Sequence, residues 1–160
     1  MKRLALILFI FIFVFSFSVG KTYAESLSTK VEVDHIANVF EKLKERITLV
    51  FKFSPDDKFA YHQYLAEKRL GELKYALDTK QGNLFEETTS RYSTYLGNFT
   101  EFAVANKMSG KKDEMLKMYE EHQKILESFN TFEYETAFWM LMMHDANATK
   151  IYSTKVKDEL

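Results

Sequence analysis

Cysteine is absent from the 160 residues, proline occurs once, at Pro55, and glycine occurs only five times. Without cysteine the chain has no disulfide, and it cannot be anchored through a lipidated cysteine. The fold must therefore be held together by packing, which favours a helical bundle. Proline and glycine interrupt helices, so their scarcity predicts that the helices are long.

Known catalytic signatures are also missing from the sequence. There is no Gly-x-Ser-x-Gly elbow, no glycine-rich phosphate loop and no His-Glu-x-x-His zinc pattern. His35 and His122 stand alone beside charged residues, and pairs such as Glu86-Glu87 fit a solvated helix surface. We therefore expect a protein that is not an enzyme and that carries no cofactor.

The first 24 residues have the pattern of a signal peptide. Lys2 and Arg3 precede an uncharged apolar run from Leu4 to Val19, and Thr22-Tyr23-Ala24 has the small residues that a signal peptidase accepts. The apolar run is shorter than the roughly 20 residues of a membrane-spanning helix. We expect cleavage after Ala24 and export to the periplasm, cell surface or exterior of a bacterium, with an uncleaved N-terminal anchor as the alternative.

Charge beyond the signal peptide is balanced and dispersed. Of the 22 lysines and arginines, three precede residue 25, which leaves 19 against 23 acidic residues, a net charge of −4. Phosphate backbones are bound by concentrated Lys and Arg, so this composition argues against a nucleic-acid partner. The 136 residues that remain are enough for one domain with a core. We predict a flexible leader over 25–33 and a single helical domain over 34–155.

Hydrophobic periodicity predicts the first helix of this domain. Apolar residues spaced three, four and seven apart lie on one helical face, and the charged residues between them form the other. We expect the apolar face to pack inward and the charged face to be solvated. The inward set is Ile36, Val39, Phe40, Leu43, Ile47, Val50 and Phe51, and the solvated set is Glu41, Lys42, Lys44, Glu45 and Arg46.

Four more helices follow from the same pattern. Ser54 as a cap, Pro55 in the first turn and two aspartates after it predict a helix start, and this helix should run to Asp78. Gly82 is interpreted as its stop. The remaining helices are predicted over 83–106, 112–128 and 132–152. The fold class is all-α, an antiparallel bundle of four to five helices.

The second helix carries the main candidate site. His62, Ala66, Arg69 and Leu73 are spaced by four, three and four residues and share one face. A half-buried arginine needs a carboxylate partner, and we expect Glu41 or Glu45, or a carboxylate of the third helix, to provide it. The structural interpretation is a clamp between helices, and the alternative is a ligand site around Arg69. The candidate residues are Lys58, His62, Glu67, Arg69 and Glu72.

The same stretch resembles a known family. Phe53-Ser54-Pro55-Asp56-Asp57-Lys58, His62 and Leu65-Ala66-Glu67-Lys68-Arg69-Leu70-Gly71-Glu72-Leu73 are similar to a family of exported bacterial all-helical domains of unknown function. That family shows a short F-x-P-D/E-x-K turn followed by an H-x-x-L-A-E-x-R-L-x-E helix. The resemblance is strongest over residues 36–77. It implies a helical fold and export to the cell envelope, and it implies no activity.

Two further motifs leave alternatives open. Met140, Met143 and His144 carry thioether and imidazole groups that suit Cu(I), which gives a metal-binding or metal-sensing envelope protein as the alternative to core packing. The C-terminal Lys157-Asp158-Glu159-Leu160 would retain an exported eukaryotic protein in the endoplasmic reticulum. The favoured interpretation is a non-enzymatic envelope module that binds a protein or another envelope component.

Overall fold

The computed structural model describes residues 28–129 and 136–160, and the predicted signal peptide lies outside this part of the chain. Within it there are five α-helices, one short 3-10 helix and no strand, which confirms the all-α fold class. The elements are α2 (Val39–Val50), α3 (Pro55–Asp78), α4 (Gly82–Ala105), η1 (Ser109–Lys111), α5 (Lys112–Phe129) and α6 (Ala137–Glu159).

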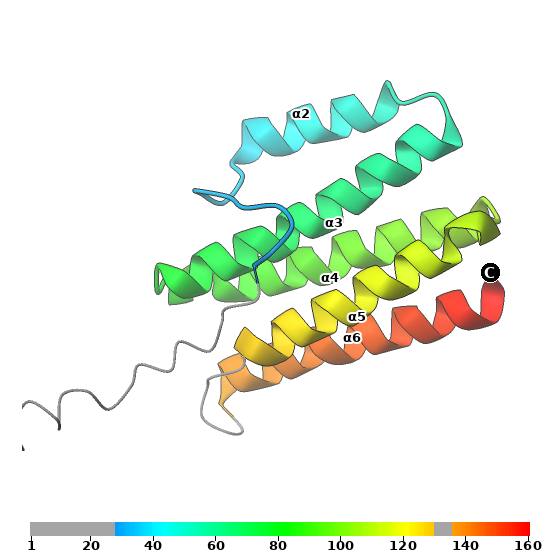
Figure 1. The fold of residues 1–160 in the computed structure, drawn as a ribbon. Coiled ribbons are helices and arrows are strands. Elements are labelled where there is room, and N and C mark those ends of the chain that lie inside the picture. The colour runs from blue at the N-terminus through cyan, green and yellow to red at the C-terminus, as the bar shows by residue number, and fades with distance from the viewer. Residues whose placement is uncertain (1–27, 130–135) are drawn as a thin grey trace, which may run out of the picture.

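Helices α3 to α6 lie side by side and alternate in direction along the chain (Figure 1). The closest neighbours are α3 with α4, α5 with α6, and α4 with α6. Short connections force this antiparallel order, because a turn of a few residues can only return the chain alongside the helix it has just left. Helix α2 lies outside this bundle, against α3 (Figure 1).

The start of α3 is the one that the sequence predicts. The Ser54 hydroxyl accepts a hydrogen bond from the Asp57 backbone N–H at 3.0 Å, and Pro55 occupies the first turn. Helix α2 begins later than residue 34. Asn38 caps it, and Glu41 returns a bond to the Asn38 backbone N–H at 2.8 Å, which completes a capping box.

The predicted stop at Gly82 is wrong, because Gly82 is the first residue of α4. Helix α3 ends at Asp78, as predicted, and α4 ends at Ala105, one residue before the predicted end. Lys80 and Lys107, two residues beyond these ends, adopt left-handed φ angles of 56° and 52°. Each end forms a pair of backbone bonds back into the helix, such as Gln81 N–H to Ala76 C=O at 2.9 Å. These bonds satisfy terminal carbonyls and offset the modest cost of a left-handed lysine.

Helix α6 extends past the predicted domain end at residue 155. It continues to Glu159, so the terminal Lys157-Asp158-Glu159-Leu160 belongs to its last turn, and Leu160 packs partly against the core. The predicted start of this helix at residue 132 lies outside the described residues, and the helix that is described begins after the cap residue Thr136.

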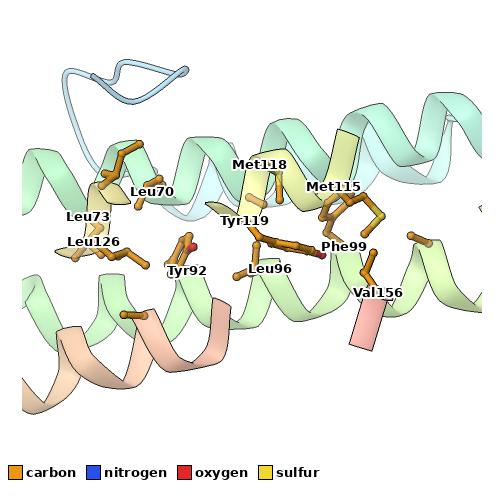
Figure 2. Close-up of a cluster of buried hydrophobic side chains, with 14 of the residues drawn as sticks. Leu70, Leu73, Tyr92, Leu96, Phe99, Met115, Met118, Tyr119, Leu126 and Val156 are labelled. Carbon is orange, nitrogen blue, oxygen red and sulfur yellow. The ribbon is translucent and has the colours of Figure 1, made fainter. Parts of the chain in front are cut away.

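The core fills the space between α3, α4, α5 and α6 (Figure 2). Its buried members run from Phe59 in α3 to Val156 in α6. Two buried tyrosines keep their hydroxyls satisfied: Tyr119 contacts the Thr100 hydroxyl at 2.8 Å, and Tyr92 contacts Thr149 at 3.2 Å. A buried hydroxyl without a partner costs about 1–3 kcal/mol, so these bonds fix how α4 sits against α5 and α6.

The orientation predicted for the first helix is wrong. The apolar residues of α2 face solvent, and its acidic residue Glu45, predicted to be solvated, is buried against α3. The physical reason is the composition of α3, which directs Lys68 and Arg69 toward α2. A buried arginine that lacked its carboxylate partner would be strongly destabilising, and the pairing of Arg69 with Glu45 leaves the apolar side of α2 on the outside.

Residues 28–38 form a strap that crosses α3 at Gly71. A Cβ atom placed on Gly71 would lie 2.3 Å from the Val31 carbonyl oxygen, closer than any side chain permits. Thr29 is buried, and the Ala37 N–H donates to Glu72 at 3.2 Å. The leader that the sequence predicts as flexible thus includes residues 28–33 of this strap, which lie directly on the helix.

Gly71→Ala should lower the stability of the protein. The added methyl forces the strap off α3, at about 1–3 kcal/mol for overpacking, which exceeds the gain of about 1 kcal/mol from replacing a helical glycine. Gly110→Ala is the matched control, because its Cβ meets nothing within 4 Å. Chemical denaturation followed by circular dichroism provides the comparison. A gain in stability for Gly71→Ala would show that the strap does not cross the helix there.

Candidate functional site

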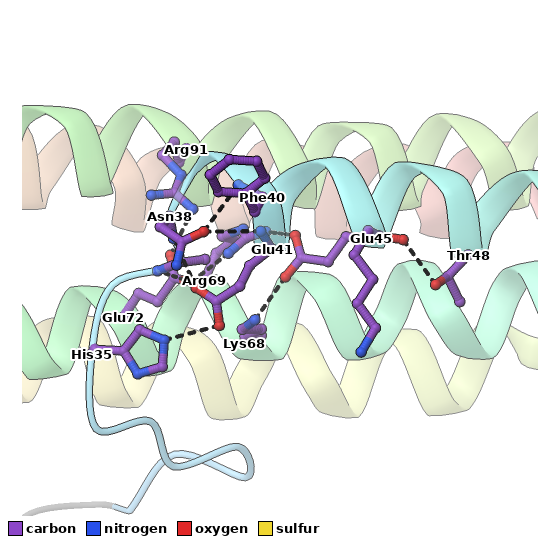
Figure 3. Close-up of polar contacts among 12 residues, drawn as sticks. His35, Asn38, Phe40, Glu41, Glu45, Thr48, Lys68, Arg69, Glu72 and Arg91 are labelled. Carbon is purple, nitrogen blue, oxygen red and sulfur yellow. Dashed lines mark hydrogen bonds and ion pairs between the residues drawn. The ribbon is translucent and has the colours of Figure 1, made fainter.

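A seam of buried charges joins α2 to α3 and α4 (Figure 3). The guanidinium of Arg69 is fully buried and pairs with Glu45 of α2 and with Glu72 one turn further along α3. Lys68 pairs with the other oxygen of Glu45 at 2.7 Å, and Arg91 of α4 reaches Glu72 at 2.9 Å. Two carboxylates and three cations therefore alternate across the seam.

This alternation is what makes the burial of charge tolerable. Burial opposes the charged form of Arg69, but the attraction of Glu72 and Glu45 outweighs it, so the pKa of Arg69 is raised. The guanidinium also lies over the Tyr95 ring, with 4.5 Å between its carbon and the ring centroid. A buried charge that lost its partner would be strongly destabilising, so the seam fixes which side of α2 faces the bundle.

His35 forms a separate surface cluster at the start of α2. Its Nε2 lies 2.9 Å from Glu41 and its Nδ1 lies 2.6 Å from Asp34, and the ring links the strap to the first turn of α2. The hydrogen bond to Glu41, followed by that to Asp34, raises the pKa of His35. The two acidic side chains of α2, Glu41 and Glu45, are thus both engaged by other residues of the protein.

The opposite side of α2 is apolar and open. Seven large apolar side chains from this helix and the turn after it retain about half or more of their accessible surface, which is unusual for a continuous set. They form what we call the α2 face: Val39 (74%), Phe40 (83%), Leu43 (53%), Ile47 (49%), Val50 (72%), Phe51 (66%) and Phe53 (84%).

A second polar chain runs through the core on the other side of α3. Glu67 contacts His122 Nε2 at 3.0 Å, and His122 Nδ1 contacts the Tyr92 hydroxyl at 3.0 Å. The hydroxyl continues to Thr149. Burial opposes the ionised form of Glu67, but the hydrogen bonds and charges of His122 and Lys30 together outweigh it, so the pKa of Glu67 is lowered. The sequence predicts that His122 stands alone, and this prediction is wrong. His122 is 1% exposed and contacts both Glu67 and Tyr92.

Asp145 of α6 is the least well compensated charge. The Ser93 hydroxyl donates to its Oδ1 at 2.5 Å, while among the residues that the structure describes Oδ2 has no hydrogen-bond partner. Burial raises the pKa of Asp145 to about 6, against the opposing effects of Ser93 and His144. This carboxyl therefore titrates in the mildly acidic range.

The structure separates the residues that the sequence grouped into one site. Arg69 and Glu72 belong to the seam, whereas Glu67 belongs to the polar chain through His122. His62 stacks on Phe102 of α4 with 4.8 Å between ring centroids. Burial lowers the pKa of His62, and Lys58, one turn before it, adds to this effect.

The three candidate metal ligands lie at the start of α6. Met140 is 54% exposed, Met143 is half-buried, and the His144 side chain is exposed with its Nδ1 3.4 Å from Asp145 Oδ1. Within residues 28–129 and 136–160 no group of three or more His, Cys, Asp or Glu side chains is placed to hold a metal ion.

The sequence offered Glu41, Glu45 or a carboxylate of the third helix as the partner of Arg69. The structure pairs Arg69 with Glu45 and with Glu72 of its own helix, whereas Glu41 contacts His35, and the other cations of the seam were missed. Lys68 and Arg91 come from different helices, and a single sequence does not show which helices are neighbours. Lys30 was also missed. It lies in the strap and bridges Glu67 at 3.4 Å and Glu121 at 2.7 Å. The one signal available was the three-residue spacing of Arg69 and Glu72, which allows an ion pair on a helix surface.

The surface cavities near these groups are small. Cavities of about 280, 220 and 200 Å³ lie beside Gly71, beside His122 and beside Tyr61, respectively. Sites for drug-sized ligands usually occupy about 300–1,000 Å³. Among the described helices, none is long and apolar enough to cross a membrane.

Comparisons with models of protein families, with curated proteins and with solved structures found no match to this chain. The resemblance to exported bacterial helical domains therefore stays a prediction from the sequence.

Proposed function

We propose that this protein is a non-enzymatic binding module of the bacterial cell envelope and that it binds its partner through the α2 face. The single observation that carries the proposal is the orientation of α2. The helix buries a carboxylate in an ion-pair seam, and seven large apolar side chains of the helix and the turn after it lie in solvent.

The energetics support a binding role. Burying an apolar side chain such as Leu or Phe contributes about 1.5–3 kcal/mol, and α2 leaves most of this unused in the free protein. A continuous exposed apolar set of this kind marks an interaction surface in soluble proteins. The rigid seam beneath it presents the face without further ordering, which reduces the entropic cost of binding.

The double variant Leu43→Ser with Ile47→Ser should leave the stability of the free protein nearly unchanged, within about 0.5 kcal/mol per site, because neither side chain packs in the core. Leu70→Ser is the matched control. Leu70 is fully buried between the helices, and its loss should cost at least about 2–5 kcal/mol. Urea denaturation at neutral pH, followed by circular dichroism, measures all three proteins.

A loss of 2 kcal/mol or more in the double variant would contradict the proposal. It would mean that α2 packs with its apolar side inward and has no free face. The double variant should also bind less of a hydrophobic fluorescent dye than the native protein, since it removes apolar surface without unfolding the chain.

A further inference from the structure

We propose that the α2 face docks on the surface of an anionic phospholipid bilayer, with α2 lying parallel to the membrane plane. This inference rests on the proposed function and names its partner. It depends on how the charges of α2 are arranged around the apolar face, which is independent of how much apolar surface is exposed.

The charges of α2 are segregated by sign around the helix. Viewed from Leu43 at the centre of the face, Arg46 and Lys42 lie about 60° and 100° to one side and Lys44 lies about 100° to the other side. Both acidic residues, Glu41 and Glu45, lie about 160° away, on the pole that faces α3. The apolar face therefore has cations on both edges and its carboxylates on the far side.

The structure holds this segregation in place. Glu45 is buried by Arg69 and Lys68, and Glu41 is engaged by Asn38 and His35. Arg46 and Lys44 are exposed, whereas Lys42 is partly covered and reaches Glu87 at 3.1 Å. Cations at the edges of an apolar stripe are the pattern by which interfacial helices bind anionic lipid.

The turn after α2 continues the same surface. Phe51 and Phe53 are exposed, so two aromatic rings extend the α2 face beyond the end of the helix, while the half-buried Lys52 between them lies with its Nζ 5.8 Å from the centre of the Tyr61 ring. Phenylalanine rings enter the boundary between headgroups and acyl chains. These residues give the docked helix an anchor at its C-terminal end.

A second copy of the chain is the main competing partner. Phe40, Leu43, Ile47 and Val50 follow the three-four spacing of a coiled-coil seam, which would allow two α2 helices to pair. Paired helices place their flanking residues opposite each other, and here the flanks of both copies would be cationic, with their carboxylates turned away. Like charges at these positions oppose pairing, whereas phosphate groups complement them.

The net charge of the protein is negative and does not favour binding to an anionic membrane. The chain beyond residue 24 carries a net charge of −4, so attraction to an anionic surface must come from the local cations of α2. Such attraction decays within about 8 Å at physiological ionic strength. Binding should therefore weaken as salt is added and should respond to the edge cations individually.

The experiment uses the full chain with one cysteine introduced at a time, since the natural sequence has none. Phe40→Cys and Ile47→Cys, on the α2 face, and Lys150→Cys, exposed on α6, are each labelled with an environment-sensitive nitrobenzoxadiazole dye. Vesicles contain phosphatidylcholine alone or with 30% phosphatidylglycerol. Residues 4–19 are themselves apolar, and a label on α2 reports the position of α2 whatever they do.

We expect both α2 labels to shift to shorter wavelength and to be quenched by lipid-borne quenchers in the phosphatidylglycerol vesicles, while the Lys150→Cys label does not change. Adding Lys44→Glu with Arg46→Glu should raise the lipid concentration for half-maximal response by about tenfold or more, since one cation near the surface changes binding by about fivefold.

Three results would overturn the membrane proposal. The first is an absent shift at both α2 positions, and the second is an equal response in vesicles without phosphatidylglycerol. The third is a blue-shifted label before any vesicle is added, which would mean that a second copy or another segment of the chain covers the face. If the Leu43→Ser, Ile47→Ser variant is nevertheless as stable as the native protein, the α2 face is still a binding surface, and its partner is a protein. If that variant is destabilised, both proposals fail.

Discussion

Arg69→Ala should lower the free energy of unfolding by about 3–5 kcal/mol at neutral pH. The sequence alone suggested about 1–3 kcal/mol, the cost of one unpaired polar group. The structure raises this expectation because Arg69 is fully buried and serves two carboxylates, Glu45 and Glu72. Without Arg69, Glu45 keeps only its ion pair with Lys68, and Glu72 keeps only its ion pair with Arg91. Urea denaturation followed by circular dichroism measures the loss.

Lys124→Ala is the matched control for this prediction. Lys124 pairs with Glu120 one turn earlier in α5, and both side chains are more than half exposed. Surface pairs of this kind contribute about 0–1 kcal/mol, so the control should be nearly neutral. A loss below 1 kcal/mol for Arg69→Ala would contradict the buried seam and would return Arg69 to the surface.

Asp145→Asn should stabilise the protein by about 1–3 kcal/mol at pH 7.5. Burial raises the pKa of Asp145 from 3.8 to about 6, and each unit corresponds to about 1.4 kcal/mol. The ionised carboxylate is therefore a cost of roughly 3 kcal/mol that the amide avoids. Asparagine retains an oxygen for the Ser93 hydroxyl, so the existing hydrogen bond is preserved.

The pH dependence of this effect has a definite sign. Between about pH 4 and pH 6 the native state binds a proton at Asp145 that the unfolded state has released, so the contribution of this group to stability falls as the pH rises. The gain from Asp145→Asn should be small at pH 4 and complete above pH 7. Asp158→Asn, at an exposed position of α6, should change stability by less than about 0.5 kcal/mol. Equal effects at pH 4 and pH 7.5 would rule out a titrating buried carboxyl.

Much of the fold follows from local signals in the sequence. The cap at Ser54, Pro55 and the two aspartates place the start of α3, and the spacing of its leucines defines the side that enters the core. The ends of α3 at Asp78 and of α4 at Ala105 also lie where the sequence predicts them, to within one residue. The residues that stop the two helices were not predicted, because the backbone bonds of Lys80 and Lys107 stabilise left-handed conformations that glycine would adopt more readily.

The side of α2 that faces the bundle could not be predicted from its own sequence. Periodicity shows that a helix is amphipathic, but it does not show which side contacts the rest of the protein. The decision depends on α3, where Arg69 needs more than the carboxylate on its own helix. The sequence allowed Glu45 as a partner of Arg69. Because Glu45 lies on the side of α2 opposite its apolar residues, that pairing places the apolar residues on the outside.

The long polar chain was beyond sequence reasoning for a different reason. Glu67, His122 and Tyr92 lie on three helices and are separated by 55 and 30 residues along the chain. Nothing in a single sequence marks such residues as neighbours. The residue types alone indicate only that a histidine on an amphipathic helix needs hydrogen-bond partners if it is buried. His122 is buried and has such partners.

Cysteine reactivity in the native protein shows which side of α2 faces solvent. Leu43→Cys and Ile47→Cys, compared with Leu73→Cys in the core, can be modified with a thiol reagent in the native full chain without lipid. We expect the two α2 cysteines to react within about tenfold of their rate in the unfolded chain, because these sites are about half exposed, while Leu73→Cys is protected until the protein unfolds. Protection of Leu43→Cys and Ile47→Cys to the level of Leu73→Cys would contradict this expectation.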